Sequence, residues 1–306
     1  MARTTLFVQV QPGGVFHIDN TALTVGNVWY VNSAATGKGT GAGYGYNPDA
    51  PFSTVAALWD AASKLASGDV VLIAAGHTET IGAAAGWDCD TAGVTLLGLG
   101  VGDLRPTFTL DTDALTDIDI DAANITFDNL RFIANFVDIA AAIDVNADGF
   151  TCRNCEFIDT SVILNAKIWI LGAAAGASDR MVVEGCEFYA YGTANTAAIS
   201  LPGTPDRCRI HDNILMGDWA TAAILAAGAI TKASILRNLI ANLPDGADLC
   251  INIAATSTGI AAYNGVGTKL GLDATTNNTF GATMAVIQNY SVDIGDRSGV
   301  LDPVAT

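Results

Sequence analysis

The chain has 306 residues, half of them hydrophobic and only 8% aromatic, so it can bury a large core built mainly from aliphatic side chains. Its 31 Asp and Glu against 14 Lys and Arg give a formal net charge of −17, which argues against a nucleic-acid binder and against an anionic membrane as partner, since both need a basic face. The N-terminus lacks a long apolar segment, so we expect no signal peptide, and no run of about 20 apolar residues predicts a membrane span. Without a secretion signal, we expect the six Cys to be reduced thiols.

Residues 1–27 differ from the repeats that follow and predict a separate N-terminal arm or attachment segment. In this stretch Val8 and Val10 alternate with polar residues, and Pro12 interrupts the alternation.

Residues 28–110 predict an N-terminal cap followed by the first coils of a repeating structure. A short strand at 29–31 leads into a Gly-rich loop over 37–46. Ser53 is then a suitable N-cap for a helix of about three turns over 54–66, which a glycine ends. Two buried strands are predicted next, at 69–73 and 93–97.

Residues 111–279 carry a repeated pattern of apolar residues and Asn. Five segments align on the anchors Asn129, Asn154, Gly185, Asn213 and Asn238, at intervals of 25, 31, 28 and 25 residues. Positions one and three places after the anchor share a strand face and are predicted to point inward: Leu130, Cys155, Cys186, Ile214 and Leu239, and Phe132, Phe157, Phe188, Met216 and Ala241. The position between them holds Arg131, Glu156 and Glu187 and is predicted to point outward.

Further short strands are predicted between these segments, at 118–120, 143–145, 168–170, 199–201, 224–225 and 251–253. A period made of strands and turns without helices predicts a β-solenoid. The expected fold class is all-β, a right-handed parallel β-helix with a short N-terminal capping helix, closed by residues 280–306. An antiparallel sandwich is the rival fold, but it would not keep columns aligned over so long a stretch.

Asn at four of the five anchors has a physical reason. Each coil must bend sharply, and Asn tolerates the left-handed backbone conformation that such a bend requires. Stacked Asn side chains can also form hydrogen bonds with one another along the axis of the coils.

The opening segments follow one another in a characteristic order: Trp29-Tyr30-Val31-Asn32, the Gly-rich loop, Asn47-Pro48-Asp49-Ala50-Pro51-Phe52-Ser53-Thr54, the predicted helix, Gly68-Asp69-Val70-Val71-Leu72-Ile73, Gly76-His77-Thr78-Glu79-Thr80-Ile81 and Gly93-Val94-Thr95-Leu96-Leu97-Gly98. This series resembles the opening of right-handed β-helix proteins of the pectate-lyase-like superfamily, and in particular a group of tailed-bacteriophage virion proteins. Gln288-Asn289-Tyr290 and Ser298-Gly299-Val300-Leu301-Asp302-Pro303 also resemble that group's ending. The resemblance covers residues 28–304.

The resemblance implies a non-enzymatic bacteriophage virion structural protein, a capsid decoration, cement or head-fibre component that is assembled in the host cytoplasm. The expected partner is the major capsid protein or another virion protein, contacted through residues near the N-terminus. A homotrimer is expected from the resemblance. The Ala runs at 140–142 and 173–175 would allow neighbouring flanks to approach, with the alternative that these Ala occupy tight turns. The alternatives are a tail-associated receptor-binding protein that recognises a host glycan, and a polysaccharide lyase or hydrolase.

Glu156 and Glu187 share one outward column in consecutive coils. Adjacent strands lie about 4.8 Å apart, close to the roughly 5 Å that separates the carboxyl groups of a retaining glycosidase. Any parallel β-helix brings outward residues to this spacing, and Arg131 could neutralise one of the two. We interpret the pair as a solvated charged ladder, and expect replacement of either residue by Gln to leave stability nearly unchanged.

Asp117, Asp119 and Asp121 alternate with Ile and are predicted to point outward, with Asp144 on the next coil. Calcium needs six to eight oxygen ligands in a compact cage. Strand neighbours on one face are about 7 Å apart, too far for three carboxylates to share one ion. The pattern therefore does not predict a metal site.

The Cys and His residues are interpreted as structural. Cys152 and Cys155 form a C-x-x-C motif, but residues three apart on one strand face opposite sides, which argues against shared zinc. Cys155 and Cys186 occupy a core column as small hydrophobic residues. His77 is expected to be a neutral, hydrogen-bonded residue of a turn. The other two His fall in a repeat strand and in the arm: His211 and His17.

The enzymes of the superfamily carry motifs that this sequence lacks. A polygalacturonase would show Asn-Thr-Asp, Asp-Asp, Gly-His-Gly and Arg-Ile-Lys, and a pectate lyase a calcium-binding Asp cluster with a basic proton abstractor. Here Asn195-Thr196 is followed by Ala197, and Gly76-His77 is followed by Thr78. We therefore predict no enzymatic activity, no catalytic, cofactor-binding or metal-binding residues, and no cofactor.

Overall fold

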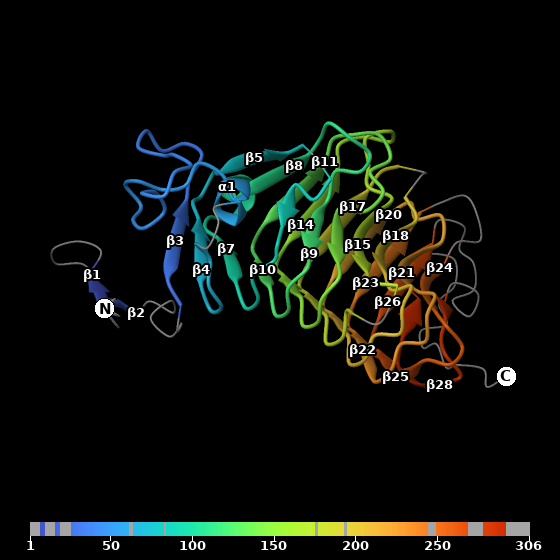
Figure 1. Ribbon diagram of the computed structural model, residues 1–306. Coiled ribbons are helices and arrows are strands. Elements are labelled where there is room, and N and C mark those ends of the chain that lie inside the picture. The colour runs from blue at the N-terminus through green and yellow to red at the C-terminus, as the bar shows by residue number, and fades with distance from the viewer. Residues whose placement is uncertain are drawn as a thin grey trace.

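The computed structural model describes residues 26–60, 64–82, 84–174, 177–192, 195–243, 249–268 and 278–291, together with the backbone of strands β1 (Phe7–Gln9) and β2 (Phe16–Ile18). β1 and β2 pair antiparallel inside the predicted N-terminal arm. The other strands form three parallel sheets that run side by side along one axis (Figure 1).

The first sheet has ten strands: β3 (Val28–Val31), β4 (Val70–Ile73), β7 (Thr95–Gly98), β10 (Thr126–Asp128), β13 (Thr151–Arg153), β16 (Val182–Glu184), β19 (Arg209–His211), β22 (Ala233–Leu236), β25 (Thr258–Ala262) and β28 (Thr283–Ile287). The second sheet has nine: β5 (Thr78–Ile81), β8 (Thr107–Leu110), β11 (Arg131–Ala134), β14 (Glu156–Asp159), β17 (Glu187–Ala190), β20 (Ile214–Gly217), β23 (Leu239–Asn242), β26 (Gly265–Thr268) and β29 (Tyr290–Ser291). The third sheet has eight: β6 (Trp87–Asp88), β9 (Ile118–Ile120), β12 (Ile143–Val145), β15 (Ile168–Gly172), β18 (Ala197–Ser200), β21 (Ala222–Ala226), β24 (Leu249–Ile253) and β27 (Asn278–Thr279).

The chain visits the three sheets in turn, and each strand pairs in parallel with its counterpart one coil away. Eight complete coils result, which we number from coil 1 (β4, β5, β6) to coil 8 (β25, β26, β27); β3 precedes them, and β28 and β29 follow. The protein is therefore an all-β parallel β-helix, as predicted, and the antiparallel sandwich is wrong. The six strands predicted between the anchors correspond to β9, β12, β15, β18, β21 and β24.

The inward columns are predicted correctly in the first three aligned segments. Their six side chains are buried in one continuous core: Leu130, Phe132, Cys155, Phe157, Cys186 and Phe188. In the last two segments the prediction is wrong. Ile214 and Met216 pair with the outward Glu187 and Tyr189, and Met216 and Leu239 are each 43% exposed. The buried residues there are Leu215 and Ile240.

The error is a slip of one residue, which exchanges the two faces of a strand. The register places Asn213 in the column of Cys186 and Asn238 in the column of Asn213, because Glu187 pairs with Ile214 and Ile214 with Leu239. The inner column thus changes from Leu and Cys to Asn between coils 5 and 6. Aligning Asn with Asn shifted the last two segments.

The bend after each strand of the first sheet occupies a different position from the inward Asn. Left-handed backbone conformations, with φ between 54° and 63°, occur at Asn129, Asn154, Gly185, Asp212 and Arg237. The predicted role of Asn at the bend therefore applies to Asn129 and Asn154. In later coils the residue before the Asn makes the bend, and the Asn is free to point inward.

The inward Asn side chains form a hydrogen-bonded ladder through coils 6 to 8 and into β29. Asn213 Nδ2 donates to Asn238 Oδ1 at 2.9 Å, Asn238 Nδ2 to Asn264 Oδ1 at 2.9 Å, and Asn264 Nδ2 to Asn289 Oδ1 at 2.8 Å. Each Nδ2 of these four residues also donates to a backbone carbonyl of the preceding coil. We call Asn213, Asn238, Asn264 and Asn289 the Asn ladder; its stacked bonds match the second predicted role of Asn.

The predicted three-turn capping helix is not confirmed. The helix α1 spans Ala56–Trp59, a single turn, and residues 64–66 are not helical, while 61–63 lie outside the described residues. Its N-cap is Val55 rather than Ser53, and the Glu79 carboxylate accepts the N–H groups of Val55 and Ala56 at 2.6 and 3.0 Å. A second short helical element, η2 (Gly102–Leu104), precedes β8.

Tertiary contacts of Lys64 explain why the helix does not continue. The Lys64 ammonium lies 4.4 Å from the centre of the Phe52 ring, with the rings of Trp29 and Tyr46 at 5.4 and 5.3 Å. It also donates to the carbonyl oxygen of Ala42 in the Gly-rich loop at 2.9 Å. Cation–π contacts and hydrogen bonds of this kind outweigh the weak propensity of a short helix.

Candidate functional site

Glu156 and Glu187 are direct neighbours on the outer face of the second sheet, since β14 and β17 pair Glu156 with Glu187. Their contacts differ. Glu156 Oε2 lies 2.6 Å from Arg131 Nε and 3.3 Å from Arg105 Nη1, and its side chain is only 14% exposed. Glu187 Oε2 accepts the Tyr189 hydroxyl at 2.8 Å, and this bond, with burial second, raises the pKa of Tyr189 to about 12.

These contacts change the stability expected of one variant. Glu156→Gln should lower the free energy of unfolding by about 1–2 kcal/mol, because it leaves Arg105 and Arg131 without their shared charged acceptor in a half-buried position. Glu187→Gln is the matched control on the next strand and should change it by less than about 0.5 kcal/mol. Urea denaturation of both variants measures the difference, and equal stabilities would contradict it.

A column of carboxylates lies on the outer face of the third sheet. The register pairs Asp88 with Asp119 and Asp119 with Asp144, so the three are outward neighbours in coils 1 to 3. We call Asp88, Asp119 and Asp144 the acidic ladder. Burial, followed by the charges of Asp117, Asp121, Asp144 and Asp88, raises the pKa of Asp119 to about 6. Burial comes first in raising the pKa of Asp88 and Asp144 as well.

A buried carboxylate lies at the neighbouring corner of the coil. Asp159, the last residue of β14, is 1% exposed and accepts the N–H groups of Ala166 and Tyr191 at 3.1 and 3.0 Å. Its other partner is the side-chain amide of Asn195. Burial raises the pKa of Asp159 to about 6, against the opposing effect of these hydrogen bonds.

Raised pKa values of Asp119 and Asp159 predict a protein that is more stable at pH 5 than at pH 7. Both groups bind protons more tightly in the folded chain than in the unfolded chain, where Asp titrates near 4. Their contribution is present below about pH 4 and is lost as pH rises through about 6. It amounts to about 1–2 kcal/mol between pH 5 and 7, mostly from the buried Asp159, because solvent screening reduces the share of the partly exposed Asp119. Thermal melts at the two pH values measure it.

The control for this pH dependence is the double variant Asp119→Asn/Asp159→Asn. It removes both titrating groups, so its melting temperature should depend much less on pH over the same range. A wild-type protein that melts at the same or a lower temperature at pH 5 would contradict the prediction.

His77 and Glu79 form a buried pair under the N-terminal cap. His77 Nδ1 accepts the backbone N–H of Ser33 at 2.9 Å, so the ring proton lies on Nε2 and points to Glu79 Oε2 at 3.2 Å. Glu79 Oε1 accepts the indole N–H of Trp87 at 3.2 Å. Together with its bonds to the start of α1, the carboxylate ties the cap to the first coil.

The remaining His lie apart from this pair. His211 Nε2 lies 2.9 Å from Ser234 Oγ on the outer face of the first sheet, and burial lowers the pKa of His211. His17 belongs to β2, of which only the backbone is described.

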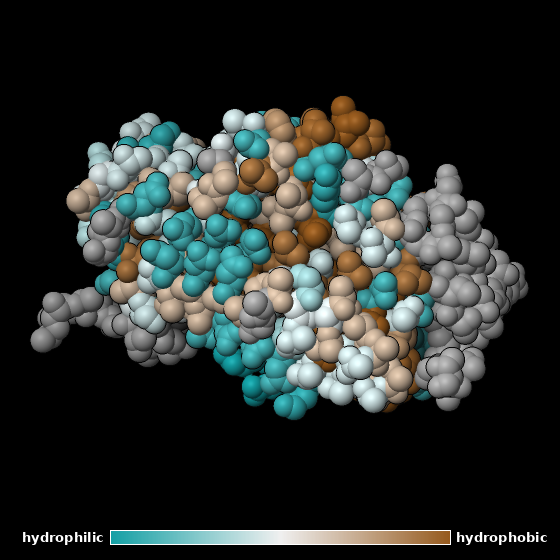
Figure 2. Space-filling model, turned by 45° about the vertical axis from the view of Figure 1, so that its right-hand side comes forward, coloured by the Kyte–Doolittle hydropathy of each residue, from teal (hydrophilic) through white to brown (hydrophobic). Residues whose placement is uncertain are grey.

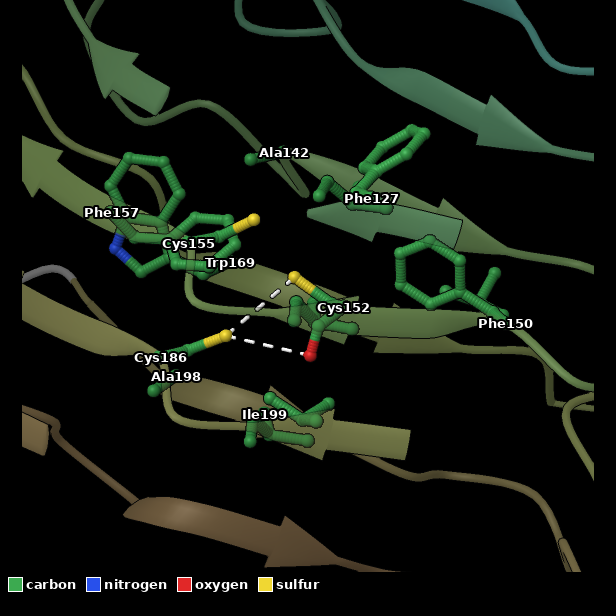
Figure 3. Packing of buried hydrophobic residues seen from close by; sticks show 14 of the residues in the cluster. Phe127, Ala142, Phe150, Cys152, Cys155, Phe157, Trp169, Cys186, Ala198 and Ile199 are labelled. Atoms are coloured by element: carbon green, nitrogen blue, oxygen red, sulfur yellow. Dashed lines mark hydrogen bonds between the residues drawn. The ribbon is translucent and has the colours of Figure 1, made fainter. Parts of the chain in front are cut away.

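All six Cys are buried, and Figure 3 shows three of them in the core: Cys152, Cys155 and Cys186. Cys152 and Cys155 both point inward, because the chain bends at Asn154 between them; the expectation that they face opposite sides is wrong. Cys186 Sγ lies 3.8 Å from Cys152 Sγ, and burial raises the pKa of both thiols. Within the described ranges, no three His, Cys, Asp or Glu are placed to hold a metal ion.

An exposed apolar strip, which sequence reasoning missed, follows the corner between the second and third sheets. Its residues come from the loops after β8, β11, β14 and β17 in four successive coils, and each is between 48% and 63% exposed: Leu115, Val137, Val162, Ile163 and Tyr191. We call these five residues the apolar ridge. Figure 2 shows hydrophobic residues on the raised upper edge of the molecule.

The Ala runs were expected to point outward, and the structure places their residues differently. Ala140 is exposed, but Ala141 and Ala142 are buried behind the ridge. Ala174 is exposed, and residue 175 lies outside the described residues.

A scan against protein-family models finds no matching family, and a search of curated proteins finds no match either. A solved rhamnogalacturonan lyase aligns with a TM-score of 0.49 at 12% identity, over 92% of this chain and 85% of the lyase. The GH136 lacto-N-biosidase from Eubacterium ramulus aligns with a TM-score of 0.29 at 9% identity, over 85% of this chain and 68% of that one. At such identities a likeness concerns the fold alone. Among the described residues no helix is long and apolar enough to cross a membrane.

Proposed function

We propose that the protein is a non-enzymatic structural component of a tailed-bacteriophage virion, a capsid decoration, cement or head-fibre protein held by the major capsid protein or another virion protein. The observation that carries the proposal is that the candidate catalytic side chains form hydrogen bonds and ion pairs with other residues of the chain. Glu156 is bound by two Arg, Glu187 by Tyr189, and His77 by Ser33 and Glu79. The contacts of Glu156 join three successive coils and those of His77 join the cap to the first coil, while Glu187 and Tyr189 pair within one strand. The resemblance of the opening series supports the virion setting.

The Trp residues bear on the alternative, a tail-associated glycan binder. Stacking on a sugar ring needs an aromatic face in solvent. Four of the five Trp are at most 2% exposed: Trp29, Trp87, Trp169 and Trp219. The fifth, Trp59, is half-buried against the core. The Trp side chains thus serve packing, which favours the structural role. The aromatic side chains that are 43–59% exposed are Tyr, and they keep the glycan binder as the alternative: Tyr46, Tyr191, Tyr263 and Tyr290. Homotrimer formation and attachment through residues 1–27 belong to the same proposal.

Two measurements test the proposed function. Quantitative mass spectrometry of purified virions should find the chain in high copy number; a few copies would favour the tail-associated alternative, and absence from virions would refute the virion role. Incubation with acidic polysaccharides, with and without calcium, should release no reducing ends or unsaturated products. Products that form with wild-type protein and vanish in Glu156→Gln or Glu187→Gln would show the enzyme instead.

A further inference from the structure

We propose that the apolar ridge and the acidic ladder together form one docking surface for a different protein, whose own surface combines an apolar strip with basic side chains. The inference rests on the proposed function and deepens it by naming a second contact surface for the partner, besides the attachment segment 1–27, and the chemistry of that partner. The ridge follows the corner between the second and third sheets in coils 2 to 5, and the ladder lies on the adjoining outer face of the third sheet in coils 1 to 3.

The ridge is continuous and its side chains are held outward. Successive coils are about 4.8 Å apart, so residues from four consecutive loops form one strip. Val137 forms a β-bridge with Leu164, and Ile139 with Ala166, which joins two of the loops. The buried Asp159 carboxylate fixes the backbone of two of the loops by accepting the N–H groups of Ala166 and Tyr191. A surface prepared in this way loses little conformational entropy on binding.

Apolar side chains in such a row need an explanation. Single exposed hydrophobic residues are normal, but contiguous ones mark interaction sites. Five side chains nevertheless cover far less than the roughly 800 Å² per partner of a stable interface. The surface beside the ridge must therefore contribute to binding.

The surface beside the ridge is acidic. The loops 111–117, 135–142, 160–167 and 191–196 contain four Asp and one basic residue, Lys167, which lies 3.7 Å from Asp138. Leu115 of the ridge is two residues from Asp117, which is followed directly by β9 and the acidic ladder. A partner with basic side chains beside an apolar strip would relieve the repulsion between the stacked carboxylates.

Charge also decides between a different protein and a second copy. The chain has a net charge of −17, so a second copy would bring excess negative charge to this corner. In the part of the chain that the structure describes, eight Lys and Arg residues already pair with acids of the same chain, among them Arg180 with Asp148, Arg207 with Asp206, and Arg237 with Asp212. The occupant is therefore a different, basic protein.

The test uses a probe with the proposed chemistry, a fluorescently labelled amphipathic peptide with a Leu face and a Lys face. Its binding to the full chain is followed by fluorescence anisotropy. Val162→Ser/Ile163→Ser and Asp119→Asn/Asp144→Asn should each weaken binding about ten-fold, equivalent to about 1.4 kcal/mol. Added salt should weaken binding to the wild-type protein.

Two controls match these variants in composition but lie away from the corner. Val101→Ser/Leu104→Ser removes equally exposed apolar side chains, and Asp206→Asn/Asp212→Asn removes two charges near the first sheet; both should bind as wild type. Equal binding by all variants would overturn the proposal. So would self-association of the wild-type chain that Val162→Ser/Ile163→Ser abolishes, because the occupant would then be a second copy.

The docking surface and the virion role can fail separately. If the chain is found in virions and both corner variants are incorporated at the wild-type level, the docking proposal fails and the virion role stands. If the chain is absent from virions, the virion role fails, and the peptide measurements alone decide on the surface.

Discussion

Asn238→Ala is expected to lower the free energy of unfolding by roughly 4 kcal/mol or more, since several buried polar groups lose their partners at once. Asn238 Oδ1 accepts from both the backbone N–H and the side-chain amide of Asn213. Its own amide donates to Ile210 O and to Asn264 Oδ1, each at 2.9 Å. The variant removes these bonds in a site where Asn238 is 1% exposed.

Urea denaturation followed by circular dichroism measures this loss. Asn146→Ala is the matched control, since Asn146 is exposed and its amide makes one side-chain hydrogen bond, to Asp121. That control should cost less than about 0.5 kcal/mol. One hydrogen bond contributes about 1 kcal/mol to stability. If the free energy of unfolding of Asn238→Ala lay within about that amount of the wild-type value, the ladder would contribute little.

Phe157→Ala is expected to cost about 3–5 kcal/mol, the usual range for truncating a core aromatic residue. The Phe157 ring stacks between Phe132, at 5.3 Å between centroids, and Phe188, at 4.5 Å with planes 5° apart. Trp169 of the third sheet approaches it at 5.4 Å (Figure 3). Removing the ring opens a cavity that rigid neighbours in three coils cannot fill.

The next residue along β14 gives the control. Ile158 points outward beside Phe157, so Ile158→Ala should cost about 1 kcal/mol or less. Melting temperatures and denaturation midpoints of the two variants would separate core burial from strand propensity. Similar losses for both would contradict the register of the second sheet.

The sequence predicted the coil architecture because strand pairing repeats the same inward pattern in every coil. Phe132, Phe157 and Phe188 were placed correctly, since each lies three residues after a bend that is Asn or Gly. The prediction of the inward column failed at Asn213, where the column changes from Leu and Cys to Asn. An inward Asn is stable only when the Asn of the next coil forms a hydrogen bond with it. The residues around it in sequence do not distinguish such an inward Asn from an Asn at a bend.

Two further features depend on contacts between distant residues. The helix predicted over 54–66 has suitable spacing, but the rings around Lys64 come from Trp29, Tyr46 and Phe52. The apolar ridge collects residues from four loops, and its members are adjacent only once the lengths of the coils are known. The sequence predicted the acidic ladder only in part. The outward alternation of Asp117, Asp119 and Asp121 could be read from the sequence, whereas Asp88 becomes a neighbour of Asp119 only through the pairing of β6 with β9.

The Asn ladder gives the coil a polarity from one end to the other. Every rung donates toward the C-terminal neighbour and accepts from the N-terminal one, so the amide dipoles of four residues point the same way. The rung at Asn289 receives a bond from Asn264 without passing one to a further Asn amide within the described chain. Separation of β29 from the coil before it therefore leaves the Asn264 amide with its backbone acceptor alone, and each further coil of the ladder that opens exposes one more amide in the same way.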